Sequence, residues 1–189
     1  MAPTAAERGR EVRRKLLTAA VELITERGWT AVSTRVVADR AGVAPGLVHY
    51  HFSSVQALLS EAALTAMRDV GAMLEPALAR ATTPAGAMAA LASALDPYTG
   101  DDPTSVLFTE TYLAATRDPG LRAAVAEVIA DFRARLAAWL GDHGVAAPAA
   151  TAAVVGAAID GLVLQRALDP ALTAEAITPV LTRLVGGRP

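Results

Sequence analysis

The stretch that most constrains the fold is residues 33–52, which read STRVVADRAGVAPGLVHYHF. Ser33 can cap a short helix over about 34–41, because its hydroxyl accepts a hydrogen bond from an unpaired N–H at the helix start. Gly42 accommodates the positive φ of a tight turn. Pro45 suits the first turn of a second helix, where its missing N–H costs nothing. We therefore predict two short helices that cross steeply at a tight turn.

The apolar residues of this stretch give each short helix one inward face. Val37, Ala41 and Val48 are expected to face the core, with Val43 filling the corner between the helices. The remaining faces of the second helix carry Gly46, Leu47, His49, Tyr50 and His51. A helix-turn-helix of this kind can place its second helix in a DNA major groove, although an ordinary αα-corner has the same spacing.

The rest of the chain is also predicted to be helical. Alanine dominates it, supported by other strong helix formers, and no segment alternates β-branched and aromatic residues as a strand would. A first helix spans about 7–27 and ends before Gly28. Turn residues delimit six further helices, at about 55–80, 84–95, 104–116, 120–141, 148–168 and 173–185. The prediction is an all-α chain of about nine helices, with domains at 1–53 and 54–189.

Charge is divided unevenly between these two predicted domains. Residues 1–53 carry eight Lys and Arg against five Asp and Glu, whereas residues 54–189 carry nine against fourteen. The net charge of the first domain is therefore +3 and that of the second is −5. The basic first domain, residues 1–53, is called the head below, and its positive charge suits an anionic partner.

Several classes of protein are not supported by the sequence. The chain has no cysteine, and it contains no HExxH, ExxH pair, Walker A loop or G-x-S-x-G. We predict a protein that is not an enzyme and uses no metal or cofactor. The longest uncharged run, between Asp142 and Asp160, is too weakly apolar for a membrane span. We expect a cytoplasmic protein with no membrane partner.

Residues 9–59 resemble the DNA-binding region of TetR-family transcriptional regulators. The resemblance lies in the segments "ERGW", "RVVADRAGV", "HYHF" and "SSVQALL". Two later segments, "TRDPGLR" at 116–122 and "AIDGLVLQRALDP" at 158–170, look like the family's ligand-binding and dimerisation half. The resemblance implies a homodimer that binds a near-palindromic operator in double-stranded DNA and is released by a small effector. The alternative is a helical dimeric module that binds a small molecule or a protein, with weak or lost DNA binding.

Eight positions match DNA-contacting positions of the family, namely Thr34, Arg35, Pro45, Gly46, Leu47, His49, Tyr50 and His51. Arg35 is expected to reach a base edge or a phosphate, and Leu47 a thymine methyl. Tyr50 and Phe52 fit either a contact or a core role. Three positions depart from the family pattern: Ala44 replaces a hydroxyl cap, Val55 replaces lysine, and His49 replaces tyrosine. The departures at Ala44 and Val55 are the support for the alternative.

The resemblance also implies an effector site among the middle helices. Its candidates are Met67, Met73, Met88, Phe108, Thr109, Tyr112, Phe132 and Trp139, whose mostly apolar character favours a hydrophobic effector. Glu110 or Asp131 could receive a cationic one.

A row of small residues at i+4 spacing marks the predicted helix at 148–168. Ala149, Ala153, Ala157 and Gly161 permit the close approach of another helix. The resemblance assigns this helix and the last one to a four-helix dimer interface, for which we select Ala153, Ala157, Asp160, Gly161 and Leu164. Packing within one chain is the alternative.

Overall fold

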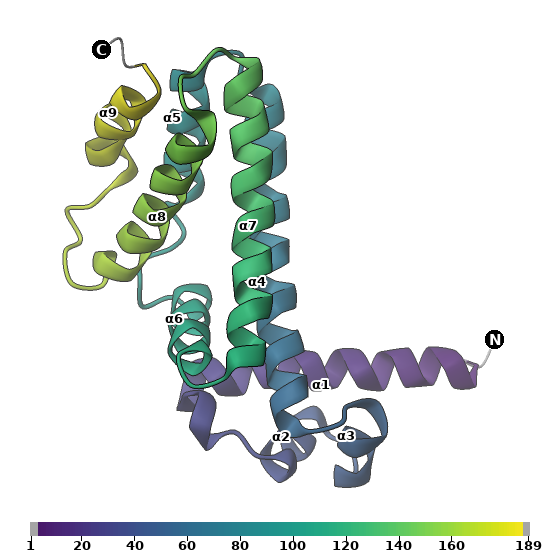
Figure 1. The fold of residues 1–189 in the computed structure, drawn as a ribbon. Helices are drawn as coiled ribbons and strands as arrows, with labels where there is room; N and C mark the ends of the chain where they lie inside the picture. Colours follow the sequence, from purple (N-terminus) through teal and green to yellow (C-terminus); the bar gives the residue numbers. More distant parts are fainter. Residues whose placement is uncertain (1–3, 187–189) are drawn as a thin grey trace. The chain divides into compact units, whose positions relative to one another are not determined.

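The computed structural model describes residues 4–186, which are helical with connecting turns and contain no strand. The all-α prediction is confirmed, and the described residues form nine α-helices (Figure 1). In chain order these are α1 (Ala5–Arg27), the 3-10 helix η1 (Trp29–Ala31), α2 (Thr34–Ala41), α3 (Pro45–His51), α4 (Val55–Arg80), α5 (Pro84–Ala94), α6 (Pro103–Ala115), α7 (Pro119–Asp142), α8 (Pro148–Arg166) and α9 (Ala174–Val185).

The chain divides into two compact units. The first unit comprises the described residues up to Ala66 together with Val106–Arg122. The second comprises Met67–Ser105 and the described residues from Ala123 onward. Most of α6 therefore belongs to the unit that contains α1, α2 and α3. The division after residue 53 remains a prediction from the sequence.

Helix α1 begins two residues before its predicted start because Thr4 and Glu7 form a capping box. The Thr4 hydroxyl accepts from the Glu7 amide at 3.2 Å, and the Thr4 amide donates to the Glu7 carboxylate at 2.6 Å. This exchange satisfies two N–H groups at the helix start. The helix ends at Gly28, whose φ of 79° and ψ of 157° are accessible almost only to glycine.

The turn between α2 and α3 forms as its sequence predicts. The Ser33 hydroxyl accepts from the Val36 amide at 3.4 Å, and Gly42 has a left-handed φ of 67°. Pro45 is the first residue of α3. Val37 and Val48 are fully buried and join the two helices to the core of the first unit.

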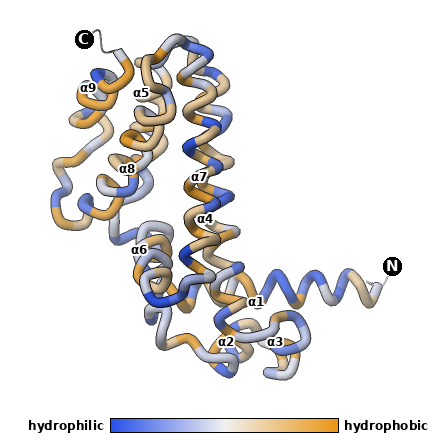
Figure 2. Tube along the Cα trace, viewed as in Figure 1, coloured by the Kyte–Doolittle hydropathy of each residue, from blue (hydrophilic) through white to orange (hydrophobic). Residues whose placement is uncertain are grey.

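The second unit is built around a cluster of apolar side chains from α4, α5, α7, α8 and α9. Helix α5 packs extensively against α9. Met88 and Leu91 of α5, with Leu136 and Leu140 of α7, are fully buried in this cluster. Figure 2 shows hydrophobic residues along α5, α8 and α9, in contrast to the hydrophilic N-terminal part of α1.

Within residues 4–186, one helix is long and apolar enough to cross a membrane by length and composition alone. It is α8, and little of it is buried in this chain. Core helices of soluble proteins meet the same criterion, so this is weak evidence for a span. An apolar helix that one chain leaves uncovered is also what a protein–protein interface requires.

Candidate nucleic-acid interface and effector region

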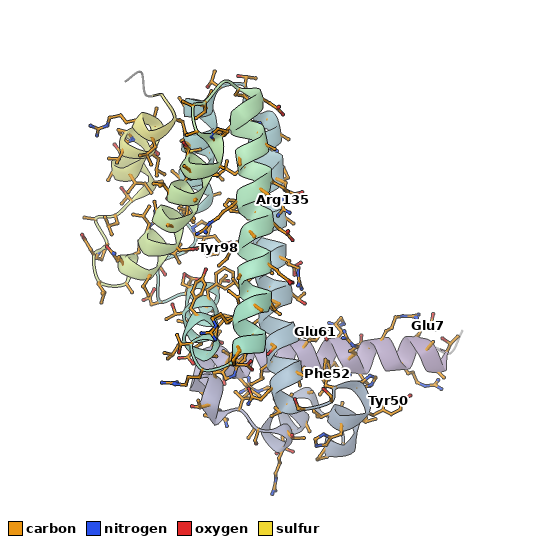
Figure 3. The ribbon with its side chains drawn as sticks, in the orientation of Figure 1. Glu7, Tyr50, Phe52, Glu61, Tyr98 and Arg135 are labelled. Atoms are coloured by element: carbon orange, nitrogen blue, oxygen red, sulfur yellow. The ribbon has the colours of Figure 1, made fainter. Side chains whose placement is uncertain are left out.

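Helix α3 presents a mixed surface to solvent. Pro45, Gly46, His49 and Tyr50 are exposed, whereas Leu47 and His51 are half-buried. The Tyr50 side chain projects away from α3 and is 79% exposed (Figure 3). The structure therefore places Tyr50 among the residues free to meet a partner.

Phe52, for which the sequence allowed either role, belongs to the core. It is only 5% exposed, and the Arg13 guanidinium of α1 lies 5.0 Å from the centre of its ring. A cation over an aromatic face is attracted by the negative charge density of the ring. Phe52 thus anchors the end of α3 rather than contacting a partner.

Arg35 stands at the start of α2 with its side chain in solvent. The side chain is 87% exposed, and its closest carboxylate contact is a 4.0 Å approach of Nε to Asp39. So exposed and distant a pair contributes little to stability. The Arg35 guanidinium is therefore available to an anionic partner, and Thr34 next to it is half-buried.

Among the arginines of the basic head, Arg13 and Arg40 bond to carboxylates on other helices of the first unit. Arg13 donates to both oxygens of Glu61, which joins α1 to α4. Arg40 donates to Glu26 at 2.6 and 2.8 Å and to Glu22 at 3.1 Å, which joins α2 to α1. These hydrogen bonds raise the pKa of Arg40 and lower the pKa of Glu26. A count of arginines along the sequence therefore overstates how many guanidinium groups are free to contact DNA.

Helix α6 is tied to the head through Glu110. Its carboxylate accepts from the backbone amide of Trp29 at 2.7 Å. The Trp29 indole Nε1 in turn donates to the Gln56 side chain of α4 at 2.9 Å. The sequence analysis names Glu110 as a group that could bind a cationic effector. Glu110 and Trp29 are 81 positions apart, and no sequence feature near either of them indicates that they form a hydrogen bond.

The structure divides the predicted effector residues between the two units. Met88 is fully buried in the apolar cluster of the second unit, and Phe132 and Trp139 pack at the edge of that cluster. Trp139 stacks on His143 with ring centres 3.7 Å apart, and Asp131 is exposed on α7. Met67 is buried on α4, and the candidates on α6 belong to the first unit: Phe108, Thr109 and Tyr112.

Cavities in the described part of the second unit include the following two. One, of about 640 Å³, is lined by α4 and α5 residues that include Met73. The other, of about 400 Å³, is lined by Asp96, Thr99, Asp101, Arg166, Ala167, Pro170, Leu172 and Thr173. Apart from Met73, no predicted effector residue lines either cavity. In residues 4–186 no group of three or more His, Asp or Glu side chains could hold a metal.

Helices α8 and α9 expose a row of large apolar side chains. Val154, Leu164 and Leu168 are exposed on or just after α8, and Val180 and Leu184 on α9. Among the predicted interface residues, Ala157, Asp160 and Leu164 are exposed, whereas Ala153 and Gly161 are half-buried. The predicted interface set does not include the exposed side chains of Val154, Leu168, Val180 and Leu184. The i, i+4 spacing of Val180 and Leu184 in the sequence indicates that these two side chains share one face of α9.

Comparisons with known proteins agree with this architecture. Residues 16–62 match the family model described as bacterial regulatory proteins, tetR family. Residues 82–187 match the model described as tetracyclin repressor-like, C-terminal domain. The HTH-type transcriptional regulator BetI of Brucella anthropi is 34% identical over 79 residues, which are 42% of this chain and 41% of that protein. The chain thus matches about two fifths of the length of these curated relatives.

Solved structures match over nearly the whole chain. A transcriptional regulator of Streptomyces coelicolor A3(2), SCO7518, superposes with a TM-score of 0.80 and 30% identity, covering 94% of this chain and 99% of that one. The multidrug binding protein EbrR, solved with imidazole, has a TM-score of 0.71 and 31% identity, covering 94% and 96%. The matched families, BetI and SCO7518 are described as regulators rather than enzymes, and the chain belongs to the TetR family of bacterial transcriptional regulators.

Proposed function

We propose that this chain is a homodimeric repressor that binds a near-palindromic operator in the cytoplasm and is released by a small molecule. The observation that carries the proposal is the solvent-facing surface of α3 on a firmly held head. Val48 and Phe52 anchor α3 in the core, while its outer residues stay exposed. A recognition helix must combine these two properties to enter a major groove in one orientation.

The proposed DNA contacts divide into base readout and backbone positioning. Arg35 is long, exposed and always charged, which suits a bidentate contact to guanine. Leu47 can meet a thymine methyl, and Gly46 lets the backbone approach closely. Phosphate or backbone contacts are assigned to Thr34, Pro45, His49, Tyr50 and His51.

Dimerisation is supported by the uncovered apolar face of α8 and α9. An exposed apolar row of this kind costs free energy unless a partner removes it from water. A second copy of the chain would pair the row with itself about a two-fold axis. Two heads related by that axis would read two half-sites, which is why the proposed operator is near-palindromic.

The proposed effector is small and hydrophobic. EbrR, which is 29% identical to this chain in its malachite green complex, is described as a multidrug binding protein. In the second unit of this chain, Phe132 and Trp139 are half-buried aromatic side chains beside the apolar cluster, and they could bind an apolar ligand. The candidates on α6 remain predictions from the sequence.

Fluorescence anisotropy tests the proposal, with DNA from upstream of the gene and its neighbours against scrambled DNA of the same composition. Selective binding that weakens steeply along a salt series is expected, because phosphate contacts release counterions. Compounds that release the operator would then identify the effector. The same assay detects the repressor's dimer, since half of the operator should bind far more weakly.

Weak binding that is equal on both DNAs would overturn the operator proposal. It would favour the second candidate, a helical dimer that binds a small molecule or protein. One observation favours that candidate: Ala44 makes no side-chain hydrogen bond at the start of α3. The recognition helix therefore lacks a cap that stabilises such a helix by about 1 kcal/mol.

A further inference from the structure

The N-terminal stretch of α1, residues 4–15, carries the whole positive excess of the head. It contains five Lys and Arg against two Glu, whereas residues 16–53 carry three cations and three carboxylates. The stretch precedes residues 16–62, the range that matches the tetR family model. Figure 1 shows it extending past α3, and Figure 2 shows that it is hydrophilic. The contacts proposed above for α2 and α3 leave this charge without a role.

Part of the charge is used within the first unit. Arg13 donates to both oxygens of Glu61. Arg14 donates to both oxygens of Glu11, at 2.7 and 3.0 Å. Lys15, by contrast, is exposed and forms no hydrogen bond or ion pair with any described residue. Its ammonium group can therefore bind an anion from outside the chain.

Lys15 shares a face of α1 with Arg8. Seven residues make almost two full turns of an α-helix, so Arg8, Lys15 and Glu22 follow one another along one side of α1. Glu22 accepts a hydrogen bond from Arg40 of α2 at 3.1 Å, which identifies this side as the one on which α2 lies. Arg8 and Lys15 are both exposed, so α2 does not cover them. The two side chains thus precede α2 along the same face.

The same stretch of α1 is held beside the C-terminal end of α3. A Cβ at Gly9 would lie 4.0 Å from Cε1 of His51, the last residue of α3. One turn further along α1, the Arg13 guanidinium lies 5.0 Å from the ring centre of Phe52. These two contacts fix the position of the basic stretch relative to the proposed recognition helix.

The major groove of DNA brings phosphates to this position. The groove is about 12 Å wide and is bordered by a phosphate backbone on each side. Helix α3 has seven residues and is about 10 Å long, so its end at His51 reaches the border of a groove that it enters. The adjacent face of α1 then meets the bordering backbone, whose negative charge complements Arg8 and Lys15.

We propose that Arg8 and Lys15 bind the DNA phosphate backbone that borders the major groove, beside the bases that α3 reads. The inference rests on the proposed placement of α3 in DNA. Phosphate contacts supply affinity and fix the orientation of a protein on the duplex, but they carry no sequence information. This surface therefore strengthens binding to operator and to other DNA by the same factor.

Fluorescence anisotropy of Lys15→Ala and Arg8→Ala tests the proposal on operator and scrambled duplexes of equal length. Each variant should bind both duplexes about tenfold or more weakly at 0.1 M salt, with the ratio of the two affinities unchanged. The slope of log affinity against log salt should become shallower by about two, because a dimer loses one phosphate contact in each chain. The thermal midpoint of Lys15→Ala should equal that of the wild type, because its side chain is exposed and unpaired.

Arg10→Ala is the matched control. It removes the same charge from the same exposed stretch, but Arg10 lies about 140° around the helix from Lys15. It should keep the wild-type salt slope. A wild-type slope in Lys15→Ala or Arg8→Ala, an equal loss in Arg10→Ala, or a loss confined to the operator would overturn the proposal. Equal binding of operator and scrambled DNA by the wild type would overturn the operator proposal alone, because the slopes on scrambled DNA still measure the phosphate contacts.

Discussion

At the scale of single residues, two glycines of the head are expected to respond differently to substitution by alanine. Gly28 adopts a φ of 79° and a ψ of 157°, and a Cβ there would lie 3.4 Å from the Glu110 carboxylate. Gly46 lies in α3, and a Cβ added to it would have no other atom within 4 Å. Gly28 is needed because its backbone conformation is strained for any other residue. Gly46 is not needed by the backbone, and it leaves space on the outer surface of α3.

Gly28→Ala should lower the free energy of unfolding by about 1–3 kcal/mol, because an L-residue is strained in this backbone region. Gly46→Ala should leave stability equal or raise it by about 0.5–1 kcal/mol, because alanine is the better helix former. Urea unfolding measures both. Gly46→Ala should nevertheless weaken operator binding, because its methyl group holds the backbone away from DNA. Equal stabilities for the two variants would contradict this assignment.

Arg35→Ala should weaken operator binding by about 1–3 kcal/mol if the guanidinium reads a guanine. Stability should not change, since the side chain is 87% exposed. The measurement is anisotropy on specific DNA, with unfolding followed in parallel. Arg68→Ala, which removes an exposed arginine from α4, is the control and should bind as the wild type does. If Arg35→Ala binds the operator with wild-type affinity, Arg35 does not contact a base.

At the scale of elements, the start of α6 depends on Asp102. Its carboxylate accepts from the amides of Thr104 at 3.0 Å and Ser105 at 3.1 Å, and also from Thr99 in the preceding turn. Desolvation raises the pKa of Asp102, but the hydrogen bonds from Ser105, Thr99 and Thr104 outweigh it and hold the pKa below 3.8. The charged carboxylate therefore stabilises the helix start.

Asp102→Ala should cost about 0.5–2 kcal/mol at neutral pH, because it removes an N-cap acceptor. The folded pKa is depressed, so this stabilisation is present above the ordinary pKa of 3.8 and is lost as pH falls through the folded value. The stability difference between wild type and Asp102→Ala should therefore shrink as the solution is acidified below pH 3.8. Urea unfolding over a pH series checks this, and a difference that stays constant would contradict it.

At the scale of the whole molecule, α8 combines a composition apolar enough for a membrane span with a face that this chain leaves uncovered. Val154 and Leu164 are exposed on α8, and Leu168 just beyond its end is 85% exposed. Such a surface is stable in water when a second chain covers it. The assembled regulator is thus expected to bury what the single chain leaves open.

Leu164→Asp should dissociate the dimer, because each of the two symmetry-related positions would bury a charge without a partner. We expect a loss of about 2 kcal/mol or more in association free energy, measured by sedimentation velocity over a concentration series. Operator affinity should fall with it. Met73→Asp makes the same change at an exposed position of α4 and should stay dimeric. A Leu164→Asp variant as dimeric as the wild type would place the interface elsewhere.

Local signals in the sequence determined the helices and the turn of the head. Gly28, Ser33, Gly42 and Pro45 act within a few residues of themselves, because capping bonds and backbone conformations are local. Their effects could therefore be predicted without a fold, and so could the family that the segment 33–52 indicates. The capping box that starts α1 two residues before its predicted start is also visible in the sequence, as Thr4 followed three residues later by Glu7.

Only the tertiary structure decided which charges are used inside the molecule and which face outward. Arg13 pairs with Glu61, Glu110 accepts from the Trp29 amide, and Arg166 donates to the carbonyl of Leu95. Each partner lies dozens of positions from the other, and the charge state or hydropathy of a residue does not specify its distant neighbour. The sequence determined by itself the helices, the turn and the family, because those depend on near neighbours. Tertiary packing decided that Arg35 is exposed, that Arg166 is buried and that the apolar face of α8 and α9 is left uncovered.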